Sequence, residues 1–176
     1  FIHRRCKFKE KIIRVRTNVE IIVLQHIKIE DPGYIKDLML SDGFNLTTIE
    51  LDQDEKIPNN LSKFDGMFCM GGPMDTWMEK KYPWLTEEKR KIKEFVVDLK
   101  KPFLGFCLGC QLLGEVVGGK VIKSNPAEIG IMNVDFLKDK QNDILFSTFP
   151  KKIKALQWHS YEVQDLENNK DVTLLA

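Results

Sequence analysis

The residues with the clearest chemical potential form a G-x-C-x-G segment at Gly105-Phe106-Cys107-Leu108-Gly109. It stands between an apolar run at 102–106 and a helix-like run at 108–117. A reactive side chain between two glycines at a strand-to-helix turn is typical of a nucleophile elbow, here with cysteine in the serine position. Amides at the start of the following helix favour a thiolate, so we expect Cys107 to be a covalent nucleophile.

Two other uses of this cysteine stay open. A free cysteine at the end of an apolar strand is commonly a buried packing residue. Cys107 and Cys110 also form a C-x-x-C at a helix start, the placement used by dithiol oxidoreductases, but this leaves the flanking glycines unexplained. Cys6 and Cys69 form no second ligand pair at zinc-site spacing, and we expect no metal and no cofactor.

A thiolate that attacks a carbonyl needs hydrogen-bond donors for the oxyanion that develops. The backbone N–H of Leu108 directly follows the nucleophile and is one expected donor. The second is expected from Gly71-Gly72-Pro73, where two glycines let the backbone turn its amides towards the site. An ordinary turn at a strand end is the alternative interpretation of that loop.

The nucleophile also needs a base, normally a histidine oriented by a carboxylate. The chain has three histidines, at His3, His26 and His159. His3 lies in a basic stretch and His26 directly follows the first expected strand. Elimination therefore points to His159, but elimination alone is weak support.

The composition bounds the class of protein. A chain of 176 residues is about one domain, and 43% hydrophobic with 30% charged residues is ordinary for a globular protein. A net charge of +1 argues against a dedicated nucleic-acid binder. Four cysteines do not form a disulfide framework in a chain of this size, which favours a reducing cytoplasm. No apolar run approaches membrane-span length, so we expect no membrane partner.

The chain divides into a basic segment and a domain. Residues 1–18 hold many lysines and arginines, and we expect a disordered N-terminal extension there. Contact of this arm with RNA or another anionic partner is the alternative. Residues 19–176 show no repeat and no linker and are expected to form one domain.

Strands alternate with helices through the first two thirds of the chain. This order predicts an α/β fold with a doubly wound, mostly parallel sheet between helix layers. In such sheets ligands gather at the carboxyl ends of strands, where both the 71–72 glycines and Cys107 are expected. The expected strands are 20–25, 46–51, 66–70, 102–106, 120–123, 130–136, 153–158 and 172–175; the expected helices are 31–40, starting with Asp31 as N-cap, a long one opened by Thr86, 108–117 ended by Gly118-Gly119, and a short one at 143–149.

Taken together, these segments resemble the class I glutamine amidotransferases, especially the branch similar to the glutaminase domain of GMP synthase. The resemblance runs from about Val19 to Val163, with its blocks in the family order. The matching blocks include Leu24-Gln25-His26, Glu30-Asp31-Pro32-Gly33, Phe64-Asp65-Gly66, Gly71-Gly72-Pro73-Met74, Tyr82-Pro83-Trp84-Leu85, the segment from Gly105 to Leu113, Gly118-Gly119-Lys120-Val121, Glu128-Ile129-Gly130 and Trp158-His159-Ser160.

The resemblance implies a flavodoxin-like fold and a defined reaction. Cys107 would attack the side-chain amide of glutamine, form a γ-glutamyl thioester and release ammonia. The ammonia would pass to an acceptor on a synthetase subunit or domain. Water would then free glutamate. Gly72 and Leu108 would supply the oxyanion amides. Substrate binding would involve Gly71, Gln111, His159, Ser160 and Tyr161.

Two departures from the family pattern stand out. Cys110 occupies a position where relatives more often have another residue, and it adds an oxidation partner for Cys107. The family's catalytic pair is a histidine followed two residues later by glutamate, and no such pair is present. His159 lies in an earlier block that resembles a substrate loop, and its next carboxylate, Glu162, has the wrong spacing. We therefore expect the domain to be C-terminally incomplete, with its base beyond Ala176. A glutamine-binding pseudoenzyme and an elbow-containing peptidase or hydrolase remain as alternatives.

Overall fold

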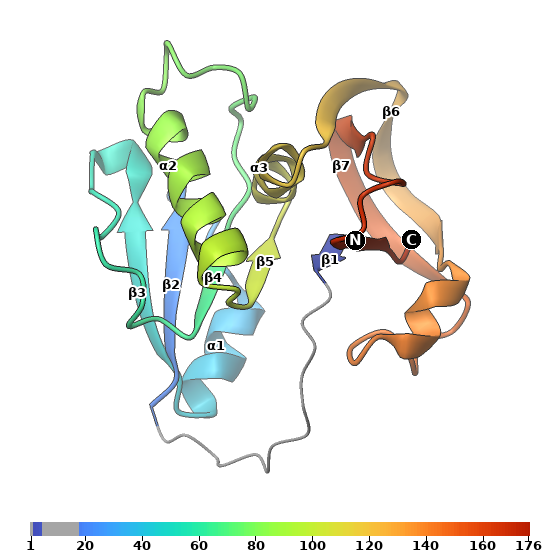
Figure 1. The fold of residues 1–176 in the computed structure, drawn as a ribbon, viewed down its shortest axis with the longest axis horizontal. Helices are drawn as coiled ribbons and strands as arrows, with labels where there is room; N and C mark the ends of the chain where they lie inside the picture. Colours follow the sequence, from blue (N-terminus) through green and yellow to red (C-terminus); the bar gives the residue numbers. More distant parts are fainter. Residues whose placement is uncertain (1, 5–17) are drawn as a thin grey trace.

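The computed structural model describes residues 2–4 and 18–176 (Figure 1). Its centre is a four-stranded parallel sheet in the order β3-β2-β4-β5. This confirms the expected parallel α/β arrangement. The strands are β2 (Glu20–Gln25), β3 (Asn45–Glu50), β4 (Gly66–Cys69) and β5 (Phe103–Gly105).

Helices cover both faces of this sheet. Alternation along β2 sends Ile22 and Leu24 to a core shared with α2 (Trp84–Lys93) and α3 (Leu108–Val116). The intervening side chains of β2 pack on the other face, against α1 (Tyr34–Ser41). The apolar run of the central strand is therefore buried on both sides, as expected for a doubly wound sheet.

The helix boundaries differ in part from those expected. α1 begins at Tyr34 rather than after Asp31, because the Asp31 carboxylate accepts from the N–H of Gly33 in a local turn before the helix. α2 continues into a π-helical turn, η2 (Glu94–Asp98). α3 ends as predicted, with Gly118 at a φ of 96° just after the helix. The short 3-10 helix η1 (Leu51–Gln53) follows β3.

A long antiparallel ribbon follows α3. It consists of β6 (Lys120–Asp135) and β7 (Lys152–Gln164), so the two separate strands expected at 120–123 and 130–136 are one strand with an irregularity between Lys123 and Glu128. In Figure 1 the ribbon lies on the far side of α3 from the parallel sheet.

The helix expected at 143–149 is wrong. The 3-10 helix η3 (Lys138–Asn142) precedes it, and 143–149 is a series of turns. The carboxylate of Asp143 accepts from the N–H groups of Leu145 and Phe146 as an N-cap does, and the Ser147 N–H donates to the Asp143 carbonyl, so a first turn forms. It does not extend, because Phe149 bonds back to Phe146 in a tighter turn and Pro150 follows.

The ends of the described chain pair with each other. β1 (Ile2–Arg4) is antiparallel to β8 (Val172–Leu174). The rest of the basic segment, residue 1 and residues 5–17, lies outside the described residues. The disorder expected for 1–18 therefore stays a prediction for most of that segment. Within the described part of the chain, none of the helices combines the length and apolarity that a membrane crossing requires.

Candidate functional site

The strand-turn-helix geometry around Cys107 is that of a strained elbow. Cys107 joins β5 to α3 with φ 46° and ψ −105°, a conformation that side-chain-bearing residues rarely adopt. The two flanking glycines are sterically required. A Cβ on Gly105 would lie 2.6 Å from the carbonyl carbon of Gly109, and a Cβ on Gly109 would collide with the carbonyl oxygen of Cys69. Gly105 is thus required because the end of β5 lies against the first turn of α3, and Gly109 because that turn lies against β4.

Three strand ends meet at this elbow. Cys107 follows β5, the Gly71-Gly72 loop follows β4, and His26 follows β2. Backbone hydrogen bonds join the segments, including Gly109 N–H to the carbonyl of Met70 at 3.2 Å. A Cβ placed on Gly71 would lie 3.6 Å from the Cβ of Cys107, so the glycine loop borders the thiol directly.

The acidity of the thiol departs from the expectation of an activated thiolate. The N–H of Leu108 donates to the Cys107 thiol and lowers its pKa, as the helix start predicts. Although Cys107 is an exposed residue, desolvation of its thiol by the surrounding chain is the larger effect, and together with the negative charge of Glu30 it raises the pKa of Cys107 above its usual range. The thiol of the free protein is therefore mostly protonated at neutral pH.

The structure brings several residues of the expected substrate site together. Gln111, on α3, is almost fully buried and donates from Nε2 to the carbonyl oxygen of Tyr161 at 3.2 Å. The Tyr161 ring packs edge-on against Trp77, with 4.9 Å between ring centroids. Ser160 precedes Tyr161 on β7. The hydrogen bond between Gln111 and Tyr161 joins β7 to α3, the helix that directly follows Cys107.

His159 is held within the ribbon. Its Nε2 lies 3.0 Å from a carboxylate oxygen of Glu128, the residue opposite it on β6, and 3.2 Å from Oε1 of Gln157. Its Nδ1 is buried and has no partner among the described residues. Glu128 on the earlier strand, rather than Glu162, thus orients this histidine.

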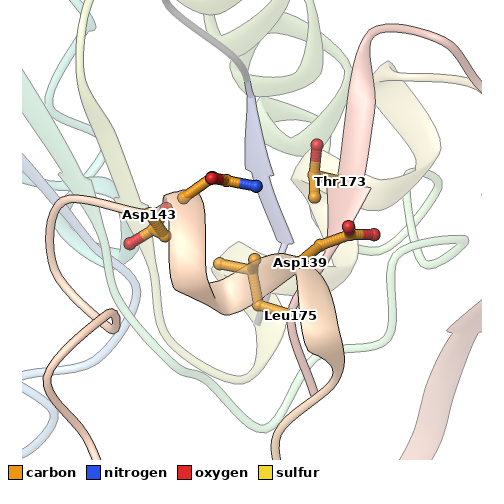
Figure 2. A pocket seen from close by; sticks show the side chains of 5 residues that line it. Asp139, Asp143, Thr173 and Leu175 are labelled. Carbon is orange, nitrogen blue, oxygen red and sulfur yellow. The ribbon is translucent and has the colours of Figure 1, made fainter.

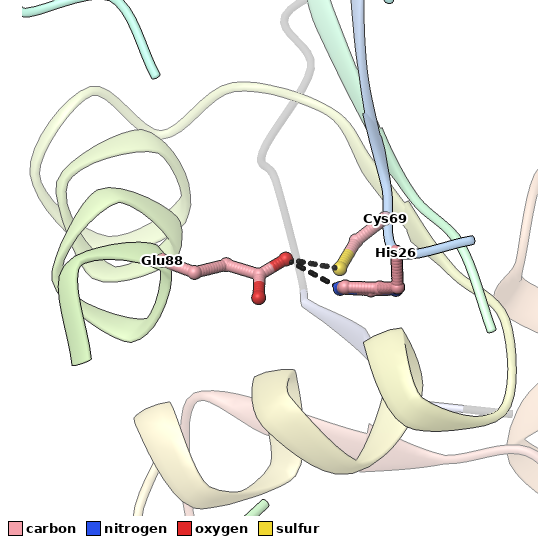
Figure 3. Close-up of side chains that lie close together, drawn as sticks. All are labelled: His26, Cys69 and Glu88. Atoms are coloured by element: carbon pink, nitrogen blue, oxygen red, sulfur yellow. Dashed lines mark hydrogen bonds and ion pairs between the residues drawn. The ribbon is translucent and has the colours of Figure 1, made fainter. Parts of the chain in front are cut away.

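A buried cluster that was not predicted from the sequence lies beneath the glycine loop (Figure 3). His26 Nε2 lies 2.9 Å from Glu88 Oε1, and the Cys69 thiol donates to the same oxygen at 3.2 Å. All three side chains are fully buried. A signal for this cluster exists in the sequence, because Glu88 interrupts the apolar face of α2 between Leu85 and Ile92.

The distances within this cluster do not fit a metal site. Its three ligand atoms lie within 4.8 Å of one another, and His, Cys and carboxylate are all zinc ligands. Ligands around tetrahedral zinc are about 3.3 Å or more apart, given bond lengths near 2.0–2.3 Å. The observed 2.9 and 3.2 Å contacts are hydrogen-bond distances, so the cluster is a hydrogen-bond network in this arrangement.

A small pocket lies away from the elbow and the buried cluster, between η3 and β8 (Figure 2). None of its lining residues was predicted to carry chemistry, and none is a cysteine, histidine, lysine or arginine. The lining consists of Asp139, Asn142, Asp143, Thr173 and Leu175.

Comparisons with known proteins agree with this geometry. The family model for class I glutamine amidotransferases matches residues 9–176. A glutamine-hydrolysing GMP synthase subunit from Sulfolobus acidocaldarius is 30% identical over 129 residues, which are 73% of this chain and 62% of the relative. The GMP synthase subunit of the same name from Pyrococcus abyssi is 34% identical over 79 residues, 45% of this chain and 40% of the relative. The chain thus spans less than two thirds of the length of these relatives.

Solved structures give the same result. A glutamine amidotransferase from Thermotoga maritima superposes with a TM-score of 0.76 and 30% identity, covering 83% of this chain and 62% of the other. One from Methylobacillus flagellatus superposes with a TM-score of 0.73 and 26% identity, covering 84% and 57%. The elbow, the parallel sheet and a family model that matches nearly the whole sequence lead to one assignment: this chain belongs to the class I glutamine amidotransferase family.

Proposed function

We propose that this chain hydrolyses the side-chain amide of L-glutamine and supplies the ammonia to an acceptor. The observation that carries the proposal is the position of Cys107, on a strained turn with the Leu108 amide on its sulfur and the Gly71-Gly72 loop beside it. Relatives named as glutamine-hydrolysing GMP synthase subunits support the same reaction.

The chemistry follows from these groups. The Cys107 thiolate attacks the amide carbon of glutamine, and the N–H groups of Leu108 and Gly72 donate hydrogen bonds to the oxygen, which takes the negative charge. The carbon–nitrogen bond then breaks, the nitrogen takes a proton, and ammonia leaves a γ-glutamyl thioester. Water attacks the thioester, which returns the thiol and yields glutamate. The net reaction consumes glutamine and water.

Because the pKa of Cys107 is raised, a base must remove its proton once glutamine is bound. His26 is not proposed for this role, since both its ring nitrogens are engaged and its side chain is fully buried. His159 is not proposed either, because it lies in the Trp158-His159-Ser160 block that resembles a substrate loop, and its remaining ring nitrogen, Nδ1, is buried. We propose instead that it contributes to the substrate loop.

The amino-acid end of glutamine is proposed to bind where α3 meets β7. Gln111 and the Tyr161 carbonyl are already joined there, with Ser160 and His159 adjacent in the strand and Gly71 at the elbow. Neither nucleic acid nor a cofactor is part of this proposal.

The ammonia acceptor is proposed to be a synthetase subunit or domain, as the names of the GMP synthase relatives suggest. We further propose a cytoplasmic location, supported by Cys69, Cys107 and Cys110, which are all free thiols in the structure.

A second candidate, a glutamine-binding pseudoenzyme, is favoured by one observation, namely that both ring nitrogens of His26 and Nε2 of His159 are engaged by groups other than Cys107. Hydroxylamine separates the two, because it converts a γ-glutamyl thioester into a hydroxamate. Full-length protein incubated with glutamine should yield ammonia and, with hydroxylamine, the hydroxamate. Cys107→Ser should yield neither, and Cys110→Ser should yield both. Glutamine binding without hydroxamate would favour the pseudoenzyme. Loss of product in Cys110→Ser would favour the dithiol alternative.

A further inference from the structure

The carbonyl oxygen of Gly71 accepts a hydrogen bond from a buried histidine, His26. His26 Nδ1 lies 2.8 Å from this oxygen. In a trans peptide, the carbonyl of one residue and the N–H of the next point in opposite directions. The His26 contact therefore also sets the direction of the Gly72 N–H, which faces away from the ring. Gly72 is the residue proposed to bind the oxyanion.

The hydrogen on Nδ1 is fixed by the chemistry of its partner. A carbonyl oxygen only accepts, so Nδ1 carries a hydrogen in either protonation state of the ring. Nε2 faces Glu88, which is as fully buried as His26. A charged ring donates to the carboxylate there, and a neutral ring accepts from the carboxylic acid. The donation to Gly71 is the same in both cases.

Trp84 and the Glu88–Cys69 pair also restrict the His26 ring. Trp84 stacks on it, with 5.4 Å between centroids and 24° between planes. Cys69 donates to the Glu88 oxygen that also contacts the ring, and burial raises the pKa of Cys69 well above its usual range, so it remains a thiol. Burial lowers the pKa of His26, but Glu88, the Gly71 carbonyl and Glu30 together outweigh that effect, and the net pKa is raised. The ring thus has little freedom to turn.

We propose that His26, fixed by Glu88, is a positioning residue that aims the Gly72 amide at the oxyanion formed during glutamine hydrolysis. The inference rests on the proposed function. His26 acts through the Gly71–Gly72 peptide and touches neither substrate nor the reacting thiol. Although Cys69, His26 and Glu88 have the residue types of a catalytic triad, the buried, protonated Cys69 is not a nucleophile.

Two amide substitutions separate the roles of the two ring nitrogens. The side-chain nitrogen of asparagine takes the place of Nδ1, so His26→Asn keeps a donor for Gly71. The longer glutamine reaches the place of Nε2, so His26→Gln keeps the contact with Glu88 and leaves Gly71 without its donor. Glu88→Gln retains the size of the Glu88 side chain and leaves Nδ1 in place.

The measurements are kcat and KM for glutamine in the full-length protein, and the alkylation rate of Cys107 by iodoacetamide, a displacement that forms no oxyanion. His26→Gln should lower kcat by up to about 100-fold with little change in KM, as for a misdirected oxyanion donor. His26→Asn and Glu88→Gln should keep kcat close to that of the unmodified protein. The iodoacetamide rate should be similar in all variants.

Equal kcat losses in His26→Asn and His26→Gln would overturn the inference, as would a loss in Glu88→Gln as large as in His26→Gln. A parallel fall in the iodoacetamide rate would also overturn it, since that result indicates general disruption. If His26→Asn and His26→Gln fail to fold, Glu88→Ala decides, because it removes the partner of Nε2 that fixes the ring. Glu88→Ala should then lower kcat with the iodoacetamide rate unchanged, and an unchanged kcat would overturn the inference. An unmodified protein that alkylates normally but releases no ammonia would instead refute the proposed function.

Discussion

Glu30 and Cys107 lie on two sides of the same glycine. A Cβ placed on Gly71 would collide with the Glu30 carboxylate and lie 3.6 Å from the Cβ of Cys107. The charge of Glu30 contributes to the raised pKa of Cys107. The Glu30 carboxylate therefore adds to the effect of desolvation on the Cys107 thiol, and the Leu108 amide at the helix start opposes both.

This balance predicts the effect of Glu30→Gln. Removing the negative charge should lower the pKa of Cys107 and shift its alkylation profile to lower pH. At pH 7, below the pKa of Cys107, the variant then has a larger fraction of its Cys107 as thiolate than the unmodified protein. Iodoacetamide should therefore react with it about 3- to 10-fold faster. Glu167→Gln is the matched control, because Glu167 is exposed and does not contribute to the pKa shift of Cys107. A profile unchanged from that of the control would show that Glu30 does not influence the thiol.

The ribbon histidine gives a second prediction. His159→Ala removes the contact with Glu128 and one side chain of the proposed substrate loop. We expect kcat/KM for glutamine to fall by about 10-fold or less, mainly through KM, because loss of a general base costs about 10²–10⁴-fold. Steady-state kinetics of the full-length protein checks this. Complete loss of activity with an intact fold would identify His159 as the base.

Much of the fold follows from local sequence patterns. The apolar runs of β2, β4 and β5 and the glycines that end α3 are short-range signals, so their placement within the chain was correct to a few residues. The G-x-C-x-G pattern of the elbow is equally local, although the contact of Gly109 with Cys69 that requires the second glycine is not.

The buried cluster could not be predicted in the same way. His26 and Glu88 are 62 positions apart, and their contact depends on α2 crossing the end of β2. The ribbon was missed as a unit because its strands have exposed apolar residues on one face, such as Ile129 and Trp158, which alternation does not separate from core positions. The helix expected at 143–149 stops after one turn, because Pro150 follows directly and leaves no room for a second.

Close packing at the elbow predicts unequal effects of adding one methyl group. Gly109→Ala places a carbon against the backbone carbonyl of Cys69, which cannot move without disturbing β4. Gly66→Ala meets only Cδ1 of Ile21, at 2.8 Å, at the flexible end of a side chain. We expect Gly109→Ala to lower the free energy of unfolding by about 3 kcal/mol and Gly66→Ala by about 1 kcal/mol. Urea titrations would show this, and equal losses would contradict a backbone clash at Gly109.

The strained backbone of Cys107 supplies the last prediction. A side-chain-bearing residue at φ 46° and ψ −105° costs about 1–3 kcal/mol, whereas glycine adopts such angles without a steric penalty. Cys107→Ala and Cys107→Gly both remove the thiol, so their difference in stability measures the strain. Glycine gains backbone entropy in the unfolded chain, which offsets about 0.5–1 kcal/mol of the relief. We therefore expect Cys107→Gly to be more stable than Cys107→Ala by about 1 kcal/mol in thermal or urea unfolding, with both variants inactive. If Cys107→Ala is the more stable variant, the elbow stores no strain at Cys107, and the positive φ is not what holds the thiol at the helix start.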